Sequence, residues 1–233
     1  MKQWMAAGLL LLLAGCVTPL TAEQQQPMPG YVAPGKTVIG VVEDRARTEE
    51  GRAPTMLGYA RNYGIPNHWH VKHIVRTPKE DRSKTAAQLL ATRIAQGFTA
   101  KGSTVEEVAM TAPLSDSDAS SLIQSRAADR LVTFVLREWH FDVNLNWVGK
   151  FRFDSEIEVL VQRPGEGVVL RQTYKDSQAI QGIGDKSWGN MILEAYKAKL
   201  EQIINSPEVR SALTAPPAPA AVAEPATAAA PSS

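Results

Sequence analysis

Three of the four histidines lie within six residues of one another, in His68-Trp-His-Val-Lys-His73, and imidazole is a common zinc ligand. If this segment is a strand, His68 and His70 share one face and His73 points to the other, because side chains alternate along a strand. Neither a cysteine nor a carboxylate cluster stands nearby to complete a site. We therefore expect ordinary loop or strand histidines here, with no metal and no cofactor.

A second set of side chains has the types needed for acid–base chemistry. His140, Asp142, Glu156 and Glu158 fall on one face of two alternating segments, and a histidine beside carboxylates can transfer protons. The solvated face of any antiparallel sheet carries such a mixture, however, and no serine or lysine nucleophile stands in a known motif. We expect no catalytic residue, and we keep a metal-dependent or hydrolytic enzyme only as the less favoured alternative.

The single cysteine, Cys16, follows a signal-like N-terminus. Lys2 precedes an apolar run that ends in Leu13-Ala14-Gly15-Cys16, and this run is shorter than the ~20 residues of a membrane span. The ending resembles a bacterial lipobox, which implies that Cys16 is acylated on its thiol (as with palmitate) and becomes the mature N-terminus. Val17, rather than aspartate, follows it, and by resemblance to lipoprotein sorting this implies the outer membrane.

Composition narrows the choice of partners. Without Lys2 the mature chain has 24 basic and 24 acidic side chains, so it lacks the positive excess that nucleic-acid binding requires. A single cysteine excludes internal disulfides, cysteine zinc sites and thiol relays. Hydrophobic residues make up 44% and charged residues 21%, as in a folded globular domain.

The segment 46–84 is the most unusual part of the chain. From Arg45 to Lys84 it holds nine basic and four acidic residues, together with tyrosines and a tryptophan. Such a surface suits an anionic envelope component, such as a lipid head group or phosphorylated glycolipid, or an envelope protein. The alternative is a solvated loop that packs partly on the domain, with a short strand near 68–75. The candidate partner-binding residues are Arg61, Trp69, Lys72 and Arg76.

Hydrophobic periodicity predicts the elements that must position these side chains. The expected strands are 36–44, 105–109, 131–147, 151–161 and 168–174, and the expected helices are 86–101, 116–129 and 188–204. Short turns join the last three strands, which should form an antiparallel meander with its aromatic face packed in the core. These aromatic residues are Trp139, Phe141, Trp147, Phe151 and Phe153. The fold class is α+β: a two-layer sandwich whose mixed sheet has a β-α-β-α start, a three-stranded meander and a C-terminal helix.

The flanks of the domain are poor in large apolar residues. Residues 1–15 are the expected signal peptide, and 16–35, rich in proline and glutamine, the expected flexible tether. The globular domain should span 36–210 and include the basic loop 46–84. Residues 211–233 are almost entirely alanine and proline and should form a disordered tail.

Taken together, the lipobox, the proline-rich stretch and the run Val38-Ile-Gly-Val-Val-Glu-Asp44-Arg45, which opens a β-α-β unit, resemble the YajG-type bacterial lipoproteins. They are more distantly similar to other small envelope lipoproteins and to the N-terminal domain of TolB. The resemblance covers residues 13 to about 205 and implies an envelope location, without catalytic residues to carry over. We expect a non-catalytic binding or assembly module on the periplasmic face. The alternative is an accessory lipoprotein of a transport or lipopolysaccharide-export complex.

Overall fold

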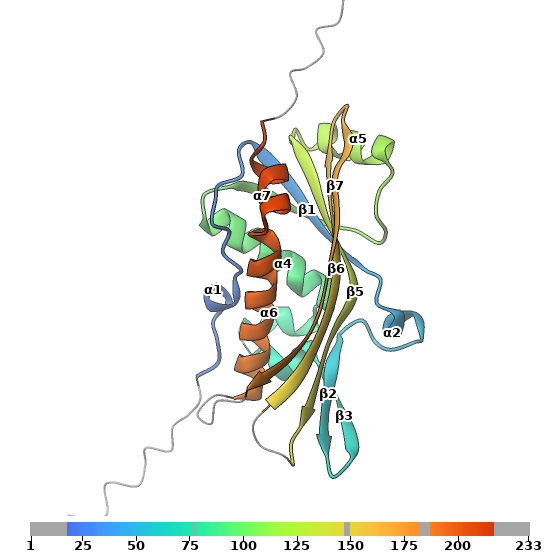
Figure 1. The fold of residues 1–233 in the computed structure, drawn as a ribbon, viewed down its shortest axis with the longest axis vertical. Helices are drawn as coiled ribbons and strands as arrows, with labels where there is room; N and C mark the ends of the chain where they lie inside the picture. The colour runs from blue at the N-terminus through green and yellow to red at the C-terminus, as the bar shows by residue number, and fades with distance from the viewer. Residues whose placement is uncertain (1–17, 77, 147–149, 182–186, 217–233) are drawn as a thin grey trace, which may run out of the picture.

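One mixed sheet of seven strands forms the frame of the domain in the computed structural model, which describes residues 18–76, 78–146, 150–181 and 187–216 (Figure 1). The strands are β1 (Lys36–Glu43), β2 (Met56–Asn62), β3 (Ile65–His70), β4 (Thr104–Ala109), β5 (Arg130–Asn144), β6 (Lys150–Arg163) and β7 (Gly167–Gln181). The helices are α1 (Ala22–Gln25), α2 (Ala46–Glu49), α3 (Val71–Ile74), the 3₁₀ turn η1 (Lys79–Ser83), α4 (Ala86–Ala100), α5 (Asp116–Ser125), α6 (Trp188–Ile204) and α7 (Pro207–Thr214).

Strand β5 is the centre of the sheet because three other strands, β1, β2 and β6, pair with it. Along one edge its first half, from Arg130 to Leu136, pairs in parallel with β1, and its second half, from Phe141, pairs in parallel with β2. Along the other edge it pairs antiparallel with β6, which pairs in turn with β7. Strand β4 follows α4 and lies parallel to β1. The β-α-β-α start and the three-stranded meander are thus confirmed, with the hairpin β2–β3 inserted between β1 and α4.

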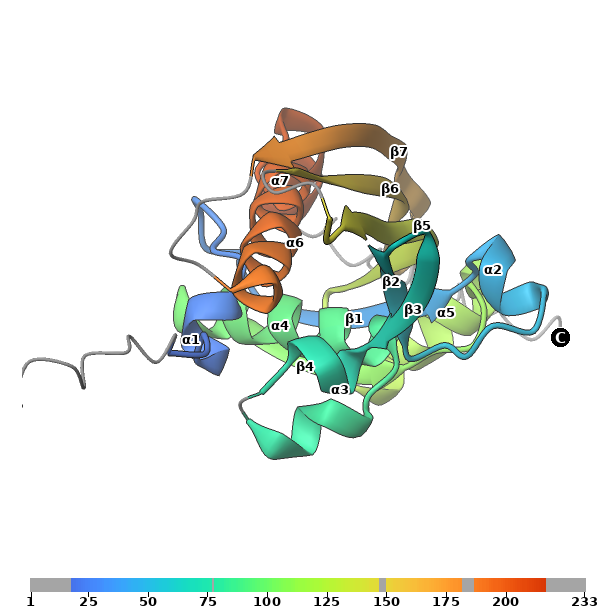
Figure 2. The same ribbon diagram turned by 90° about the horizontal axis from the view of Figure 1, so that it is seen from below.

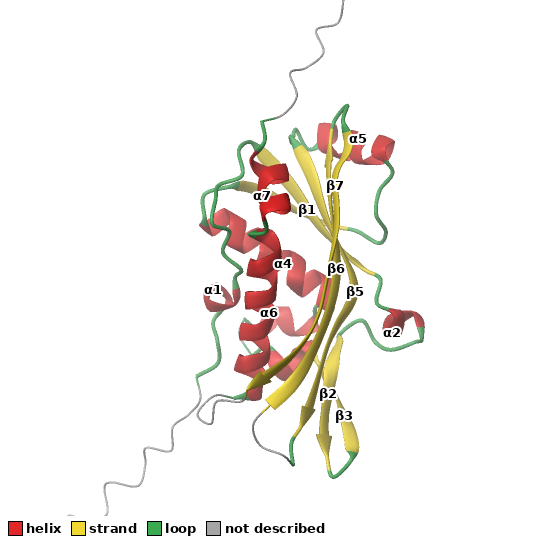
Figure 3. Cartoon of the chain, in the orientation of Figure 1, coloured by secondary structure: helices red, strands yellow, loops and turns green. Residues whose placement is uncertain are grey.

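Helices α4 and α6 cover one face of this sheet and form the second layer of the predicted sandwich (Figures 1 and 3). Thr85 and Gln88 make the expected capping box at the start of α4, and Ser187 accepts the Asn190 N–H at the start of α6. The shorter α5 packs on the opposite face, where its Ile123 joins Val38 and Leu131 in a small separate core. The sheet is therefore covered on both faces near the start of β1.

A β-bulge in β5 explains the one irregularity of the alternating pattern. Leu136 faces Ile157 and Glu138 faces Glu156, so Arg137 is an extra residue without a partner in the ladder. Because a one-residue insertion reverses the faces, Leu136 before the bulge and Trp139 after it both lie in the main core. The aromatic face of the meander is buried as predicted.

Residues 18–35 are not the flexible tether that their composition predicts. They lie along the helical layer as a strap, in which α1 contacts both α4 and α6 (Figure 2). Tyr31 and Ala33 are only 7% and 2% exposed, and the Tyr31 hydroxyl donates to the Ile204 carbonyl oxygen at 2.8 Å. The backbone of the strap is also held by two side chains of α6, Asn190 and Glu201, and by the residue that caps its C-terminus, Asn205. Partners far along the chain thus satisfy backbone groups that a linker would expose to water.

The expected basic loop 46–84 is largely regular structure. It contains α2, the hairpin β2–β3, α3 and η1, and β3 pairs along β2 up to a tight turn. The central residues of that turn, Tyr63 and Gly64, have φ of 48° and 78°, the left-handed values that a two-residue hairpin turn requires. The short strand expected near 68–75 is present only in part, because β3 ends at His70 and α3 follows it.

The C-terminal boundary also differs from the expectation. Residues 207–214 form α7, whose Val209 and Leu213 are buried, so the ordered domain extends beyond residue 210. The buried guanidinium groups of Arg130 and Arg163 donate to the carbonyl oxygens of Leu213 and Ala212 at the end of this helix, where positive charge is favourable. None of the helices in the described part of the chain is long and apolar enough to span a bilayer. Residues 1–17 and 217–233, with the signal peptide, Cys16 and most of the tail, lie outside the described residues.

Candidate functional site

A cleft at the N-terminal end of α6 brings together two of the four predicted partner-binding residues. Its volume is about 530 Å³. It is lined by Pro19, Trp69, His73, Ile74, Arg76, Ser187, Trp188, Gly189 and Asn190. Trp69 and Arg76 thus share one concave surface, which we call the tryptophan cleft, and Lys72 is exposed on α3 between them.

Both tryptophans of the cleft, Trp69 and Trp188, pack against core residues on one side and are half-exposed to solvent on the other. The Trp69 ring packs edge-on against Phe141, with ring centroids 5.9 Å apart, and Trp188 packs in the same way on Phe151 at 6.2 Å. Helix α3 lies directly against the start of α6, where a side chain at Gly189 would come within 3.3 Å of the Ile74 carbonyl oxygen. The hairpin and α6 are therefore held together at this point, and the cleft walls are fixed.

The strap closes one side of the cleft through a residue that no sequence pattern marks. The Asn190 side chain donates to the Thr18 carbonyl oxygen at 2.8 Å and accepts from the Leu20 N–H at 3.2 Å. Trp188 has the helical spacing of the apolar face of α6, and that spacing alone does not show that the residue lies at an open end of the core. Asn190 carried no signal, since its partners are about 170 residues away.

Ion pairs neutralise part of the excess positive charge of the basic segment, residues 45–84. The pairs are Arg45 with Glu43, Arg47 with Glu138, Arg61 with Asp142, and Lys84 with Asp81. Three of these acids lie outside the segment, while Asp81 also pairs with Arg93 of α4, so pairing with outside residues lowers the excess from five charges to three. In the described part of the chain no ion pair involves Lys72, Arg76, Lys79 or Arg82, which all belong to α3, η1 or the link between them. Among the described residues, four of the five unpaired cations of residues 45–84 therefore lie in or between α3 and η1, where Arg76 lines the tryptophan cleft, and the fifth, Arg52, follows α2.

Arg61 lies apart from the cleft and already has a partner. Its Nε and Nη2 atoms donate to the two carboxylate oxygens of Asp142, at 3.0 and 2.5 Å. This two-pronged contact joins β2 to β5, where the two strands pair in parallel. Its position indicates a structural role in fixing the hairpin.

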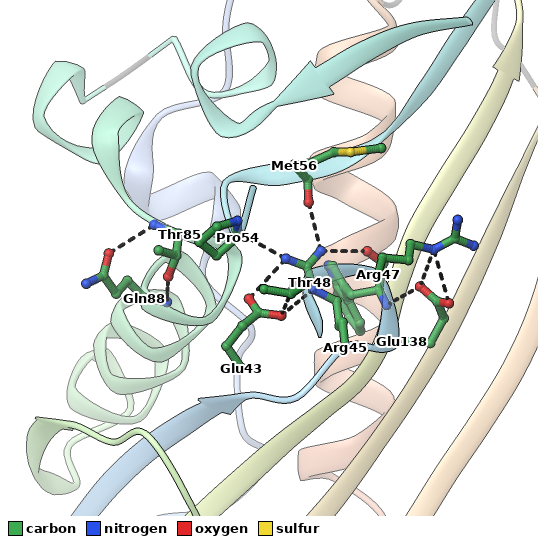
Figure 4. Close-up of polar contacts among 10 residues, drawn as sticks. Glu43, Arg45, Arg47, Thr48, Pro54, Met56, Thr85, Gln88 and Glu138 are labelled. Carbon is green, nitrogen blue, oxygen red and sulfur yellow. Dashed lines mark hydrogen bonds and ion pairs between the residues drawn. The ribbon is translucent and has the colours of Figure 1, made fainter. Parts of the chain in front are cut away.

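A buried arginine, Arg45, ties the start of the basic segment 45–84 to the sheet (Figure 4). Arg45, 3% exposed, pairs with Glu43 and donates to the carbonyl oxygens of Pro54 and Met56, at 3.0 and 2.8 Å. The third carbonyl that it reaches belongs to Trp139, at 3.3 Å. Because one guanidinium crosses from β1 to both β2 and β5, the hairpin leaves the sheet at a defined place.

Two of the three clustered histidines lie together, because the chain turns into α3 after His70, and the His70 and His73 rings pack edge-on with centroids 5.6 Å apart. His68 packs edge-on against Tyr59 at 5.2 Å, and the His70 Nδ1 atom lies 2.9 Å from the Thr55 hydroxyl. The His73 Nδ1 atom accepts the His70 backbone N–H at 3.0 Å, which fixes it as an unprotonated acceptor. Partial burial, helped by the Lys72 charge, lowers the pKa of His73. Among the described residues no group of three or more His, Cys, Asp or Glu side chains is placed to hold a metal ion.

The predicted acid–base set does lie on one face, but its members have other partners. Burial, followed by the Arg47 charge, lowers the pKa of His140 to about 3, so its imidazole is neutral. Glu156 pairs with Lys175 at 2.6 Å, and Glu158 pairs with Arg137 and Arg171 at 2.9 and 2.6 Å. These hydrogen bonds, that of Arg137 first, lower the pKa of Glu158, which is therefore ionised and not a proton donor at neutral pH.

The aromatic residues of the meander form core and not a ligand pocket. Trp139, Phe141, Phe151 and Phe153 are each at most 1% exposed, and Trp139 contacts Phe153 and Tyr196 of α6 at ring-centroid distances of 4.8 and 4.9 Å. The expectation of core packing is confirmed for these four. Trp147 lies outside the described residues.

Comparisons with known proteins give only remote likenesses. No family model matches the sequence, and no curated protein is similar to it in sequence. A DUF330 protein from Xanthomonas campestris is similar in structure at 12% identity, with a TM-score of 0.45 over 84% of this chain and 92% of that one. Lipoprotein GNA1162 from Neisseria meningitidis has 12% identity and a TM-score of 0.35, over 74% and 99% of the two chains. The LpoB C-terminal domain from Salmonella enterica has 10% identity and a TM-score of 0.27, over 69% and 93%. At these TM-scores the likenesses carry no functional inference, and the YajG-type resemblance stays a prediction.

Proposed function

We propose that this protein is a lipid-anchored, non-catalytic binding protein of the bacterial envelope, held in the outer membrane through Cys16 and facing the periplasm. The observation that carries the proposal is the sequence Leu13-Ala14-Gly15-Cys16 after a short apolar run, directly before an ordered domain. Val17 supports the outer membrane. The ion-paired carboxylates and the neutral, buried His140 support binding rather than catalysis.

The proposed partner is an anionic component of the envelope, and the proposed contact surface is the tryptophan cleft with its basic rim. Trp69, Lys72 and Arg76 support this because they combine half-exposed aromatic surface with cations that no described carboxylate neutralises. Arg61 is left out, since Asp142 already holds its guanidinium group.

The anchor is tested by Cys16→Ser. We expect this variant to lose incorporation of a clickable fatty acid and to move from the membrane to the soluble fraction, because two or more acyl chains hold a protein essentially permanently. Wild-type protein should sediment with the outer membrane on a density gradient. Sedimentation of Cys16→Ser with membranes after a high-salt wash would contradict lipid anchoring, and wild-type protein found only in the inner membrane would contradict the sorting.

A further inference from the structure

The start of the described chain, the first turn of α6 and the end of β5 lie at one end of the domain (Figure 1). Asn190, in the first turn of α6, holds Thr18. Trp188 in the same turn packs on Phe151, which pairs with Val143 near the end of β5. Cys16 precedes Thr18 by two residues, a span of at most about 7 Å. A lipid on Cys16 therefore brings the bilayer surface to this end of the domain.

The tip of hairpin β2–β3 projects from the same end. Arg61 pairs with Asn144, the last residue of β5, and the turn at Tyr63 lies beyond it. Five large apolar side chains of the described residues are exposed, and the two most exposed are both on this tip: Tyr63 at 86% and Ile65 at 67%. Two large exposed apolar side chains together on one hairpin tip are unusual for a surface that meets only water.

We propose that this end of the domain docks on the anionic bilayer that carries the anchor, with Tyr63 and Ile65 entering the headgroup region and Lys72 and Arg76 meeting lipid phosphates. The proposal rests on the proposed function, because lipidation of Cys16 supplies the nearby bilayer. Its chemistry fits: tyrosine and tryptophan favour the membrane interface, where an apolar ring and a polar tip both find suitable surroundings. Basic side chains near an anionic surface add attraction that weakens with salt.

We assign this surface to a bilayer rather than to a protein because the lipid anchor keeps the bilayer close to it. A tether of two residues keeps the surface and the lipid in contact range at all times, so even weak individual contacts become occupied. Membrane docking also predicts which side chains remain in water. Val168 pairs with Gln162, which pairs with Leu131 at the start of β5, so Val168 lies at the opposite end of the sheet.

The test uses lipidated full-length protein in vesicles and a polarity-sensitive dye on one introduced thiol. Cys16 is the only cysteine and is blocked by lipid, so Tyr63→Cys and Val168→Cys each give a single labelling site. In vesicles that contain phosphatidylglycerol, we expect a blue shift of the emission from position 63 and none from position 168. An aqueous spectrum at position 63 would overturn the proposal, and it would point to a protein partner instead while leaving the lipid anchor intact.

A second arm does not depend on lipidation. Full-length Cys16→Ser protein should co-sediment with phosphatidylglycerol vesicles and much less with phosphatidylcholine vesicles. Arg76→Ser in that chain should weaken binding roughly 5-fold, since one cation near an anionic surface contributes about 1 kcal/mol. The matched control is Lys101→Ser, an exposed cation next to β4 where it pairs with the start of β1, which should bind as before. Equal losses from both substitutions would mean that only overall charge acts, and would overturn the proposed docking face.

Discussion

Ion pairing decides which basic side chains of residues 46–84 can meet a partner. Arg61 and Arg76 look alike in the sequence, yet Asp142 holds the first while no described carboxylate pairs with the second. The partner of Arg61 lies 81 residues away, so only the structure could separate the two. Trp69 and Arg76 could be named as candidates from the sequence because charge and aromatic character are local properties, and the structure places both in one cleft, while their role in binding stays a prediction. Trp188 could not be added, since its place in the cleft depends on how α6 meets α3.

Burial of His140 makes the free energy of unfolding depend on pH, and this dependence can be measured. His140 has a folded-state pKa of about 3, below the unfolded value of about 6.5, because burial and Arg47 disfavour its charged form. Its stabilising effect is therefore complete above pH 6.5 and is lost as pH falls toward 3, by at most about 1.4 kcal/mol per pH unit. We expect the free energy of unfolding in urea to drop between about pH 7 and pH 4, and this drop to be smaller in His140→Phe.

His70 and His73 leave a residual slope of the same sign in that variant, because burial lowers the pKa of each of them as well. An identical pH profile for wild type and His140→Phe would show that His140 takes up its proton equally easily in the folded and unfolded states.

At the scale of elements, periodic segments were predictable and tertiary attachments were not. Helices α4 and α6 carry clear periods and caps, which is why their ends agree closely with the structure. The three strands of the meander were placed correctly, but β7 continues to Gln181, seven residues past the expected end at 174. The strap 18–35 has no period, and it is ordered only because α6 supplies hydrogen-bonding side chains and a groove for Tyr31. Helix α7 is likewise short and depends on two buried arginines from β5 and β6.

The attachment of the strap can be measured through Tyr31. Ile204 is the last residue of α6, so its carbonyl oxygen lacks a partner within the helix, and the Tyr31 hydroxyl satisfies it at 2.8 Å. Tyr31→Phe should lower the free energy of unfolding by about 1–2 kcal/mol, because a buried acceptor loses its donor. The matched control is Val32→Ala, which removes a side chain that is 51% exposed and should change stability by less than about 0.5 kcal/mol. Equal effects in denaturant titrations would mean that this hydrogen bond does not secure the strap.

At the scale of the whole molecule, the docked strap changes how the domain is held at the membrane. A flexible tether of twenty residues would have a root-mean-square length of about 25 Å and would let the domain rotate freely. With residues 18–35 bound along α6, only Cys16 and Val17 separate the proposed lipid from the domain surface. Helix α6 spans about 25 Å, so an upright domain would hold its far end well away from the lipid.

Attachment through the bound strap predicts a fixed orientation of the domain relative to the membrane, even without attraction to anionic lipid. Lipidated protein in phosphatidylcholine vesicles at high salt should transfer energy to a lipid acceptor more efficiently from a dye at position 63 than from one at position 168. Asn190→Ala should reduce that difference, because it releases the backbone of Thr18 and Leu20 next to the anchor. Lys175→Ala, which removes only an exposed ion pair to Glu156 on the polar face of the meander, should leave it unchanged. Equal transfer from the two positions in the otherwise unaltered protein would show that the domain tumbles despite the strap, because the two residues before Thr18 alone would then give it free rotation.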